Sequence, residues 1–198
     1  KFIGMFAFAI YDIKKQVIYL LRDRPGVKPL YYYHHQDTLL FASELKSIYT
    51  YPVFKKDVNK TAVSLFFTYG YIRAPHTIFN NTYKVQPGHY IKIDIEKKKV
   101  ENIKYWDVFD FYNKPKLKIS EEDALKEVER LFVSAFQYRM VSDVPVGLFL
   151  SGGYDSSVVA AILQSNSTQK IKTFTIGFNE KKWNEAPEAK KIAEHLGT

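Results

Sequence analysis

A glycine-rich loop that follows a short apolar segment constrains the fold of this chain more than any other sequence feature. The apolar segment, residues 146–150, predicts a buried strand, residues 151–155 predict the loop, and residues 156–164 predict a helix. A second strand is predicted over residues 171–176. Because neighbouring strands joined through a helix run parallel, this part of the chain is expected to form an α/β unit with a parallel sheet.

The loop has the sequence Ser-Gly-Gly-Tyr-Asp-Ser-Ser, and we expect it to bind an anion. At a helix start, unpaired backbone N–H groups, serine hydroxyls and the positive end of the helix dipole all favour a negative group such as phosphate. Gly152 and Gly153 allow close approach of the backbone, and Asp155 adds a carboxylate of the kind that binds Mg²⁺. No lysine closes the loop, so it is not a Walker loop. The alternative is a turn of small residues that only caps the helix.

The first half of the chain has the pattern of an antiparallel sheet. Short apolar or alternating runs separated by turn residues predict sequential hairpins, with strands over residues 6–11, 17–22, 29–34 and 39–42. The runs are nearly continuous, so both faces of the sheet are expected to be covered. One helix is predicted over residues 60–69. Arg22, Asp23 and Lys28 are interpreted as charged hairpin ends that hold one another in place.

Residues 109–119 separate these two patterns and are expected to be a linker. Pro115 and its flanking lysines disfavour regular structure there. Ser120, with Asp123 three residues later, resembles a capping box at the start of a long amphipathic helix. The expected organisation is therefore a first domain over residues 1–108, a linker over 109–119 and a second domain over 120–198.

Composition excludes several classes of function. The chain has no cysteine, so it contains no disulfide, thiolate metal site or cysteine nucleophile. Lysine and arginine exceed aspartate and glutamate by 29 to 21, but the lysines are scattered, and we expect no nucleic-acid partner. No apolar run approaches the length of about 18 residues that a membrane span needs, so no membrane association is expected and a cytoplasmic location is favoured. The chain begins at Lys1 within an apolar segment, and we expect it to be a fragment of a longer protein.

Several motifs in order resemble the glutamine-dependent asparagine synthetase family. Residues 4–12, 22–32 and 41–48 resemble the glutaminase domain of that family, a class II amidotransferase domain. The glycine loop resembles the pyrophosphate-binding loop of the ATP pyrophosphatase superfamily, which adenylates a carbonyl oxygen. The resemblance implies an α+β first part with Ntn-hydrolase-like stacked antiparallel sheets. It implies an α/β parallel-sheet nucleotide-binding unit in the second part.

The resemblance also implies the site and its ligands. ATP and Mg²⁺ are the expected cofactors, Mg²⁺ is expected at Asp155, and glutamine, aspartate and ATP are the expected substrates. A homodimer is one possible state of the full-length enzyme. The family's nucleophilic cysteine has no counterpart here, so no catalytic residue is assigned and the fragment alone is expected to be inactive. The residues expected to contact ATP are Leu150, Ser151, Gly152, Gly153, Asp155, Ser156 and Ile176.

Three alternatives to asparagine synthesis stay open. The same scaffold serves amidotransferases that act on sugar carboxylates in surface-polysaccharide biosynthesis, and synthetases that close a ring with the substrate's own amine. A non-catalytic module that keeps the fold is the third, and the intact phosphate loop disfavours it. The acceptor pocket that distinguishes the enzymes is expected to lie outside this chain.

Overall fold

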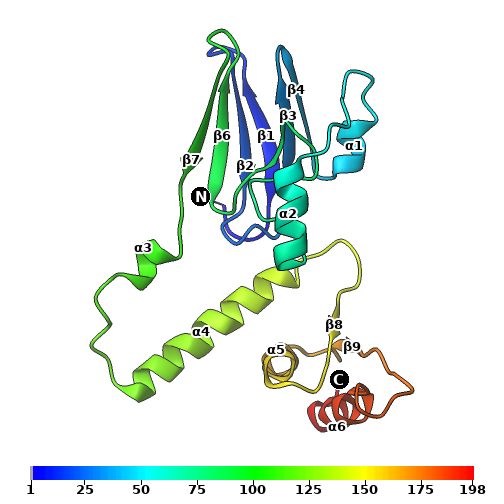
Figure 1. Cartoon of the computed structure of the whole chain (residues 1–198). Coiled ribbons are helices and arrows are strands. Elements are labelled where there is room, and N and C mark those ends of the chain that lie inside the picture. Colours follow the sequence, from blue (N-terminus) through cyan, green and yellow to red (C-terminus); the bar gives the residue numbers. More distant parts are fainter. Residues whose placement is uncertain (1) are drawn as a thin grey trace. The chain divides into compact units, whose positions relative to one another are not determined.

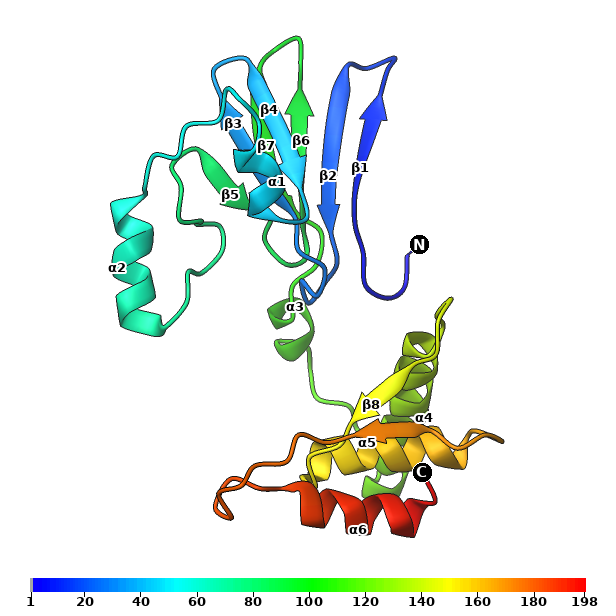
Figure 2. The same cartoon turned by 90° about the vertical axis from the view of Figure 1, so that its right-hand side faces the viewer.

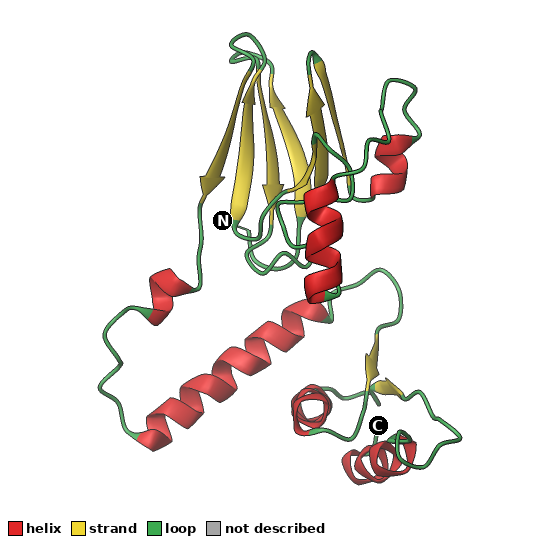
Figure 3. Ribbon diagram, in the orientation of Figure 1, coloured by secondary structure: helices red, strands yellow, loops and turns green. Residues whose placement is uncertain are grey.

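The computed structural model describes residues 2–198, which form two compact units. Unit 1 is Lys1–Pro115 and unit 2 is Lys116–Thr198. Unit 1 contains two antiparallel sheets with short helices, and unit 2 contains three longer helices and a pair of short strands (Figures 1 and 3).

The larger sheet of unit 1 has four antiparallel strands in the order β1-β2-β6-β7. Their bounds are β1 Ala7–Asp12, β2 Val17–Arg22, β6 His89–Asp94 and β7 Lys99–Lys104. The predicted hairpin of β1 and β2 is confirmed, with Ala9 opposite Leu20. The next strand in the sheet is the distant β6, which places Leu20 opposite Ile91. Local turn chemistry does not predict this long-range pairing.

The smaller sheet has three antiparallel strands in the order β4-β3-β5, and it packs against the larger sheet through one apolar core. Its strands are β3 Tyr31–His35, β4 Thr38–Ala42 and β5 Thr82–Lys84. Leu20 and Ile91 from the larger sheet share a core cluster with Tyr32 and Leu39 from the smaller one. Burial of a leucine or isoleucine side chain of this kind contributes about 1.5–3 kcal/mol. Unit 1 therefore has the stacked antiparallel sheets that the family resemblance implies.

The opposite face of the smaller sheet is also covered. Helix α1 (Leu45–Tyr49) places Ile48 in a second core cluster with Tyr33 and Phe54. The Tyr33 and Phe54 rings meet edge to face, with their centroids 5.0 Å apart. Both faces of this sheet are therefore buried, as the nearly continuous apolar strands predict.

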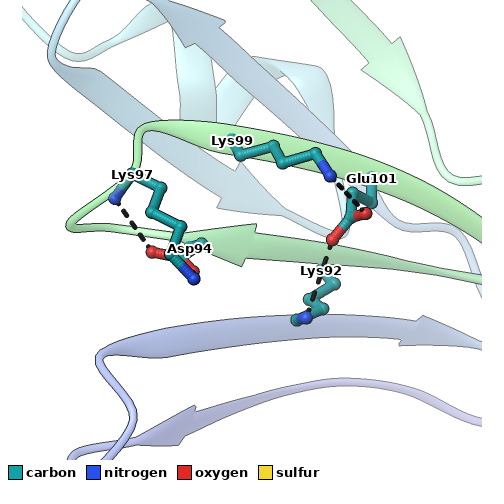
Figure 4. Close-up of polar contacts among 5 residues, drawn as sticks. All are labelled: Lys92, Asp94, Lys97, Lys99 and Glu101. Carbon is teal, nitrogen blue, oxygen red and sulfur yellow. Dashed lines mark hydrogen bonds and ion pairs between the residues drawn. The ribbon is translucent and has the colours of Figure 1, made fainter.

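Within the described part of unit 1, no layer covers the outer face of the four-stranded sheet, where the sequence predicts cover on both faces. Its outer face leaves the Ile10 side chain 48% exposed. Farther across this face, Lys92 and Lys99 form ion pairs with Glu101 (Figure 4). Asp94 accepts from the backbone N–H of Lys97, and that hydrogen bond lowers the pKa of Asp94. A run of apolar residues shows that a strand is suited to burial, but not whether a second layer covers it.

The remaining helices of unit 1 have local causes. Helix α2 (Lys60–Tyr69) begins at Asn59, whose side chain accepts a hydrogen bond from Ala62 N at 3.1 Å. Helix α3 (Phe109–Tyr112) is a single turn inside the predicted linker, where regular structure was not expected. The Asp107 carboxylate accepts a hydrogen bond from Phe109 N at 3.0 Å and so stabilises the start of this turn. The turn ends before Pro115, the residue that disfavours regular structure in this segment.

Unit 2 begins with helix α4 (Glu121–Arg139), which starts at the predicted cap. The Ser120 hydroxyl accepts from Asp123 N at 3.1 Å and donates to the Asp123 carboxylate at 2.7 Å. The apolar stripe of α4 is not buried in the described part of the chain, and Leu125 is 64% exposed. No helix within residues 2–198 combines the length and the apolar character needed to span a membrane.

The rest of unit 2 is a strand-helix-strand-helix unit with parallel strands. Its elements are β8 Gly147–Phe149, α5 Tyr154–Ser165, β9 Lys172–Phe174 and α6 Ala186–Leu196. Strands β8 and β9 lie side by side and pair in parallel (Figure 2), in agreement with the strand-helix-strand pattern of the sequence. Leu150 after β8 packs in one apolar cluster with Ala160 of α5 and Ala189 of α6.

Candidate functional site

The glycine loop lies at the carboxyl end of β8, and Leu150 anchors its start. The Leu150 side chain is 2% exposed, and its backbone N–H donates to the Phe174 carbonyl at 2.9 Å. The Thr175 hydroxyl donates to the Leu150 carbonyl at 2.7 Å. These two bonds hold Leu150, the first residue after β8, against the end of β9. The position of the loop start is therefore fixed relative to the strands.

Gly152 is required by both its backbone conformation and its neighbours. Its φ is +84°, in the region that favours glycine. A Cβ on Gly152 would lie 3.2 Å from Glu188 Cβ and 3.3 Å from Ala189 N. Both neighbours belong to the first turns of α6, so the amino-terminal end of α6 packs directly against the loop.

The serine hydroxyls of the loop face one another beside the start of α5. The Ser151 and Ser156 Oγ atoms are 3.0 Å apart, and Ser151 N donates to Ser156 Oγ at 3.2 Å. Gly153 is the N-cap of α5 and has no side chain to bond the first N–H groups of the helix. Those groups have no acceptor within the helix, and the helix dipole adds partial positive charge there. The arrangement suits an anion with several acceptor oxygens, such as phosphate.

The structure corrects the predicted position of Asp155. The sequence placed this residue in the loop, whereas it lies in the first turn of α5, which begins at Tyr154. The helix starts earlier because the Gly153 carbonyl accepts from Ser157 N at 3.1 Å and from the Ser157 hydroxyl at 2.7 Å. Asp155 is exposed in this turn, beside the proposed anion position.

The donor set at this loop is suited to a magnesium ion that a phosphate ligand also binds. Across residues 2–198, no group of three or more histidines, aspartates or glutamates could enclose a metal ion. Mg²⁺ in nucleotide sites is typically held by one or two carboxylates together with phosphate oxygens and waters. Asp155 alone supplies one such carboxylate, so the residues present fit a metal that arrives with its phosphate ligand.

A cavity of about 280 Å³ opens beside the loop, at the carboxyl ends of β8 and β9. Leu150, Ser151 and Ile176 all line it, so the structure brings together these three predicted residues. Phe149 and Phe174 contribute aromatic walls. An apolar cavity next to an anion-binding loop suits a ligand with a flat apolar group and a phosphate group.

Sequence reasoning missed the contribution of the segment before α6. Phe178 and Glu185 line the same cavity, and Glu188 borders Gly152. The available signal is the predicted strand over residues 171–176, because Phe178 follows it by two residues. The sequence does not show that α6 returns to the loop, since that return depends on packing of Ala189 against Leu150.

The Arg22 and Asp23 side chains bond backbone groups and not each other, which corrects the interpretation of Arg22, Asp23 and Lys28 as charged hairpin ends that hold one another in place. Asp23 is fully buried, and its carboxylate accepts from the N–H groups of Phe6, Val27 and Lys28 at 3.2, 2.9 and 2.9 Å. The Arg22 guanidinium donates to three backbone carbonyls, including Lys28 O at 2.8 Å. Burial lowers the pKa of Arg22, and Asp23 opposes that shift. With its carboxylate fully bonded, Asp23 is structural.

Two family models match the chain in sequence order. Residues 1–106 match the family described as "Glutamine amidotransferase domain", and residues 127–198 match the family described as "Asparagine synthase". A Methanocaldococcus jannaschii protein named as a glutamine-hydrolysing asparagine synthetase is 40% identical over 204 residues, which is 100% of this chain and 38% of that protein.

Two further relatives extend the comparison. Asparagine synthetase (glutamine-hydrolyzing) 3 of Bacillus subtilis is 36% identical over 89% of the chain and 29% of its own length. Amidase chry2 of Gibberella zeae is 32% identical over 98% of the chain and 30% of its own length. The chain therefore spans 29–38% of the length of these curated relatives.

Proposed function

This chain belongs to the glutamine-dependent asparagine synthetase family, and we propose that the protein carrying it is an asparagine synthase (glutamine-hydrolysing). In the proposed reaction, ATP activates the side-chain carboxylate of aspartate as an acyl-adenylate, and ammonia from glutamine displaces AMP. The products are asparagine, glutamate, AMP and pyrophosphate.

We divide this proposed function along the chain. Residues 1–108 would form the carboxyl-terminal portion of the glutaminase domain, residues 109–119 the linker and residues 120–198 the start of the synthetase domain. Glutamine hydrolysis would use a cysteine that is not among these residues, so the fragment alone is expected to be inactive. A cytoplasmic location and a homodimeric full-length enzyme complete the proposal.

In the proposed site, each residue of the loop has a separate task. The N–H groups at the start of α5, together with Gly152, Gly153, Ser151 and Ser156, would bind the phosphates of ATP. The backbones of Leu150 and Ile176 would flank the adenine ring in the adjacent cavity. Asp155 would hold Mg²⁺, which when bound neutralises phosphate charge and stabilises the departing pyrophosphate.

One observation carries this proposal: the anion-binding loop and the apolar cavity share Ser151. A nucleotide has one charged end and one flat apolar end, and the two must be bound next to each other. The two halves of this site adjoin within unit 2, and the cavity lies at the carboxyl edge of a parallel strand pair, where nucleotides commonly bind in α/β proteins.

Other acceptors of the amide group are compatible with the same loop and cavity. A sugar carboxylate, or an amine within the substrate itself, would use the same loop and cavity, and the relative named amidase chry2 is in agreement with a range of products in this family. A non-catalytic module is disfavoured because Asp155 is exposed at an uncapped helix start, where it serves no packing role.

The test is Asp155→Asn in the full-length enzyme, with two activities measured on one preparation. Pyrophosphate release with aspartate and ATP is expected to fall about a hundredfold, which corresponds to about 2.7 kcal/mol of lost transition-state stabilisation. Glutamate release with glutamine alone is expected to stay largely unchanged, because that activity belongs to the other domain.

A matched control is Glu194→Gln, which removes an exposed carboxylate from α6 without touching the loop or the cavity. Both activities should persist in this variant. Unchanged pyrophosphate release in Asp155→Asn would show that Asp155 is not a metal ligand. A parallel loss of both activities would instead assign the loop to structure or domain coupling.

A further inference from the structure

Unit 1 contains a second cavity, of about 380 Å³, at the end of the two sheets where their hairpin turns lie. The turn between β3 and β4 and the turn between β6 and β7 form its mouth. Figures 1 and 2 show both turns at the same end of the sheets. The residues of this cavity lie between positions 18 and 98, and none of them lines the cavity beside the phosphate loop.

The floor of this cavity is an open end of the apolar core. Ile18, Leu39 and Ile93 line it and also belong to the core cluster between the two sheets. Phe41 and Ile95 line it nearer the mouth and are 45% and 41% exposed. An apolar group of a few carbon atoms entering here would remove these surfaces from water, which is favourable. The floor therefore suits an aliphatic or aromatic body.

Three charged side chains line the cavity: Asp94 is paired with Lys97 at 3.3 Å, and Asp37 and Lys98 face each other from different sheets. Lys98 Nζ donates to Asp37 Oδ1 at 2.6 Å across the mouth. The two side chains are 70% and 79% exposed, so their ion pair is screened by salt and contributes little to stability. A negative ligand group can therefore replace Asp37 as the partner of Lys98, and a positive ligand group can replace Lys98 as the partner of Asp37.

Each of the two rim turns contains a residue with a positive φ. Gln36 and Lys98 have φ of +53° and +52°, a left-handed conformation that glycine or asparagine adopts more easily. Both residues line the cavity mouth. Gln16 in the turn between β1 and β2 has the same conformation, at φ +52°, so it is a feature of these hairpin turns, and in the turn between β6 and β7 it holds Lys98 at the cavity mouth.

We propose that this cavity binds a small zwitterion with an apolar side chain, that is, a free α-amino acid of the aliphatic or aromatic class. The ligand carboxylate would pair with Lys98, its ammonium group with Asp37, and its side chain would rest on the floor formed by Ile18, Leu39 and Ile93. A ligand with only one charge would separate Lys98 from Asp37 and leave one of them without a partner. A zwitterion satisfies both and keeps the rim electrically balanced.

The first experiment measures equilibrium binding to the full-length protein by titration calorimetry. L-Leucine is the probe, and three compounds each lack one of its features: 3-methylbutylamine lacks the carboxylate, 4-methylpentanoate lacks the ammonium group, and glycine lacks the side chain. Saturable binding of leucine, and affinities about tenfold weaker for each of the three, are expected. Absence of saturable leucine binding, or equal affinity for glycine, would overturn the proposal.

The second experiment assigns the binding to this cavity. Lys98→Gln and Asp37→Asn should each weaken leucine binding about tenfold. Lys14→Gln, in the turn between β1 and β2 but outside the cavity lining, should leave the affinity unchanged. All three variants change exposed turn residues, and their circular dichroism verifies folding. Leucine binding that survives in both rim variants would place the amino acid elsewhere and refute the site.

Discussion

Two aspartates, one in each unit, show how the same side chain acquires different roles. Asp23 in unit 1 is fully buried, and three backbone N–H groups donate to its carboxylate. Asp155 in unit 2 is exposed in the first turn of α5, after an N-cap glycine that supplies no side-chain bond. The buried carboxylate has its acceptor capacity used by the protein, whereas the exposed one is available to a ligand.

Hydrogen bonding to the surroundings, and not residue type, separates the structural carboxylate of Asp23 from the carboxylate of Asp155, for which a ligand role is proposed. Asp23 organises a turn, because Gly26 N and Gly88 N also donate to its backbone carbonyl, both at 3.1 Å. The loop around Asp155 leaves N–H groups of α5 directed away from the helix. The polar groups around Asp23 in unit 1 therefore bond one another, whereas N–H groups at the start of α5 in unit 2 have no acceptor within the helix.

The largest expected effect that would test this contrast is on stability, in Asp23→Ala. The N–H groups of Phe6, Val27 and Lys28 would lose their acceptor in a buried site, which should cost about 3–5 kcal/mol. Amide hydrogen exchange in β2 and β6 of the full-length protein measures the free energy of opening of this unit. The matched variant Asp155→Ala should change the opening free energy of unit 2 by less than about 1 kcal/mol. Similar losses in the two variants would break the comparison.

A second pair of variants compares glycines in the two units. Gly88 has φ +66°, and a Cβ there would lie 2.3 Å from the Trp106 carbonyl oxygen. Gly88→Ala should therefore destabilise unit 1 by about 2–4 kcal/mol, because a backbone atom has to move. Gly152→Ala meets Glu188 Cβ at 3.2 Å, a milder contact that α6 can relieve by shifting.

We expect Gly152→Ala to cost about 1–2 kcal/mol in stability. Its larger effect should be on the KM for ATP, since the shift of α6 disturbs the loop. Thermal unfolding and ATP titration of the same two preparations measure both quantities. A greater loss of stability in Gly152→Ala than in Gly88→Ala would contradict this difference between a backbone clash in unit 1 and a contact that α6 can relieve in unit 2.

The smallest expected effect appears only at alkaline pH. Burial, with a smaller contribution from Tyr83, raises the pKa of Tyr32 from 10.0 to about 12. Unfolded chains release this proton near pH 10, while the folded protein retains it. The contribution of Tyr32 to the free energy of unfolding is therefore fully present below pH 10 and is lost as the pH rises towards 12. Tyr32→Phe should lack this part of the alkaline decline in the unfolding midpoint. Tyr154→Phe, whose side chain is 94% exposed in the wild type, serves as the control in unit 2 and should follow the wild-type profile.

Local sequence signals predicted the starts of elements well. Asn59 and Ser120 both bond the helix N–H groups that their positions require, because a cap depends on residues only three positions apart. The order of strand, glycine loop and helix was predicted for the same reason, since these elements follow one another within a few residues. The boundary error at Asp155 arose because Gly153, and not a polar residue, is the cap.

Long-range features were beyond these signals. The pairing of β2 with β6, more than sixty positions later, depends on which apolar faces fit together across the core. The exposure of the outer face of the four-stranded sheet and of the α4 stripe depends on which layers are present. The cavity between the two hairpin turns depends on the Lys98 and Asp37 side chains meeting from different sheets.

The antiparallel pattern of the first half, the strand-loop-helix order of the second half and the lack of cysteine are all evident from the residues alone. Folding is what gives the Asp23 carboxylate three backbone N–H donors, returns α6 to Gly152 and places Ile176 in one cavity with Leu150 and Ser151. The physical reason is range. Propensities, caps and turns act over a few residues, whereas burial and hydrogen-bond satisfaction depend on segments that only folding brings together.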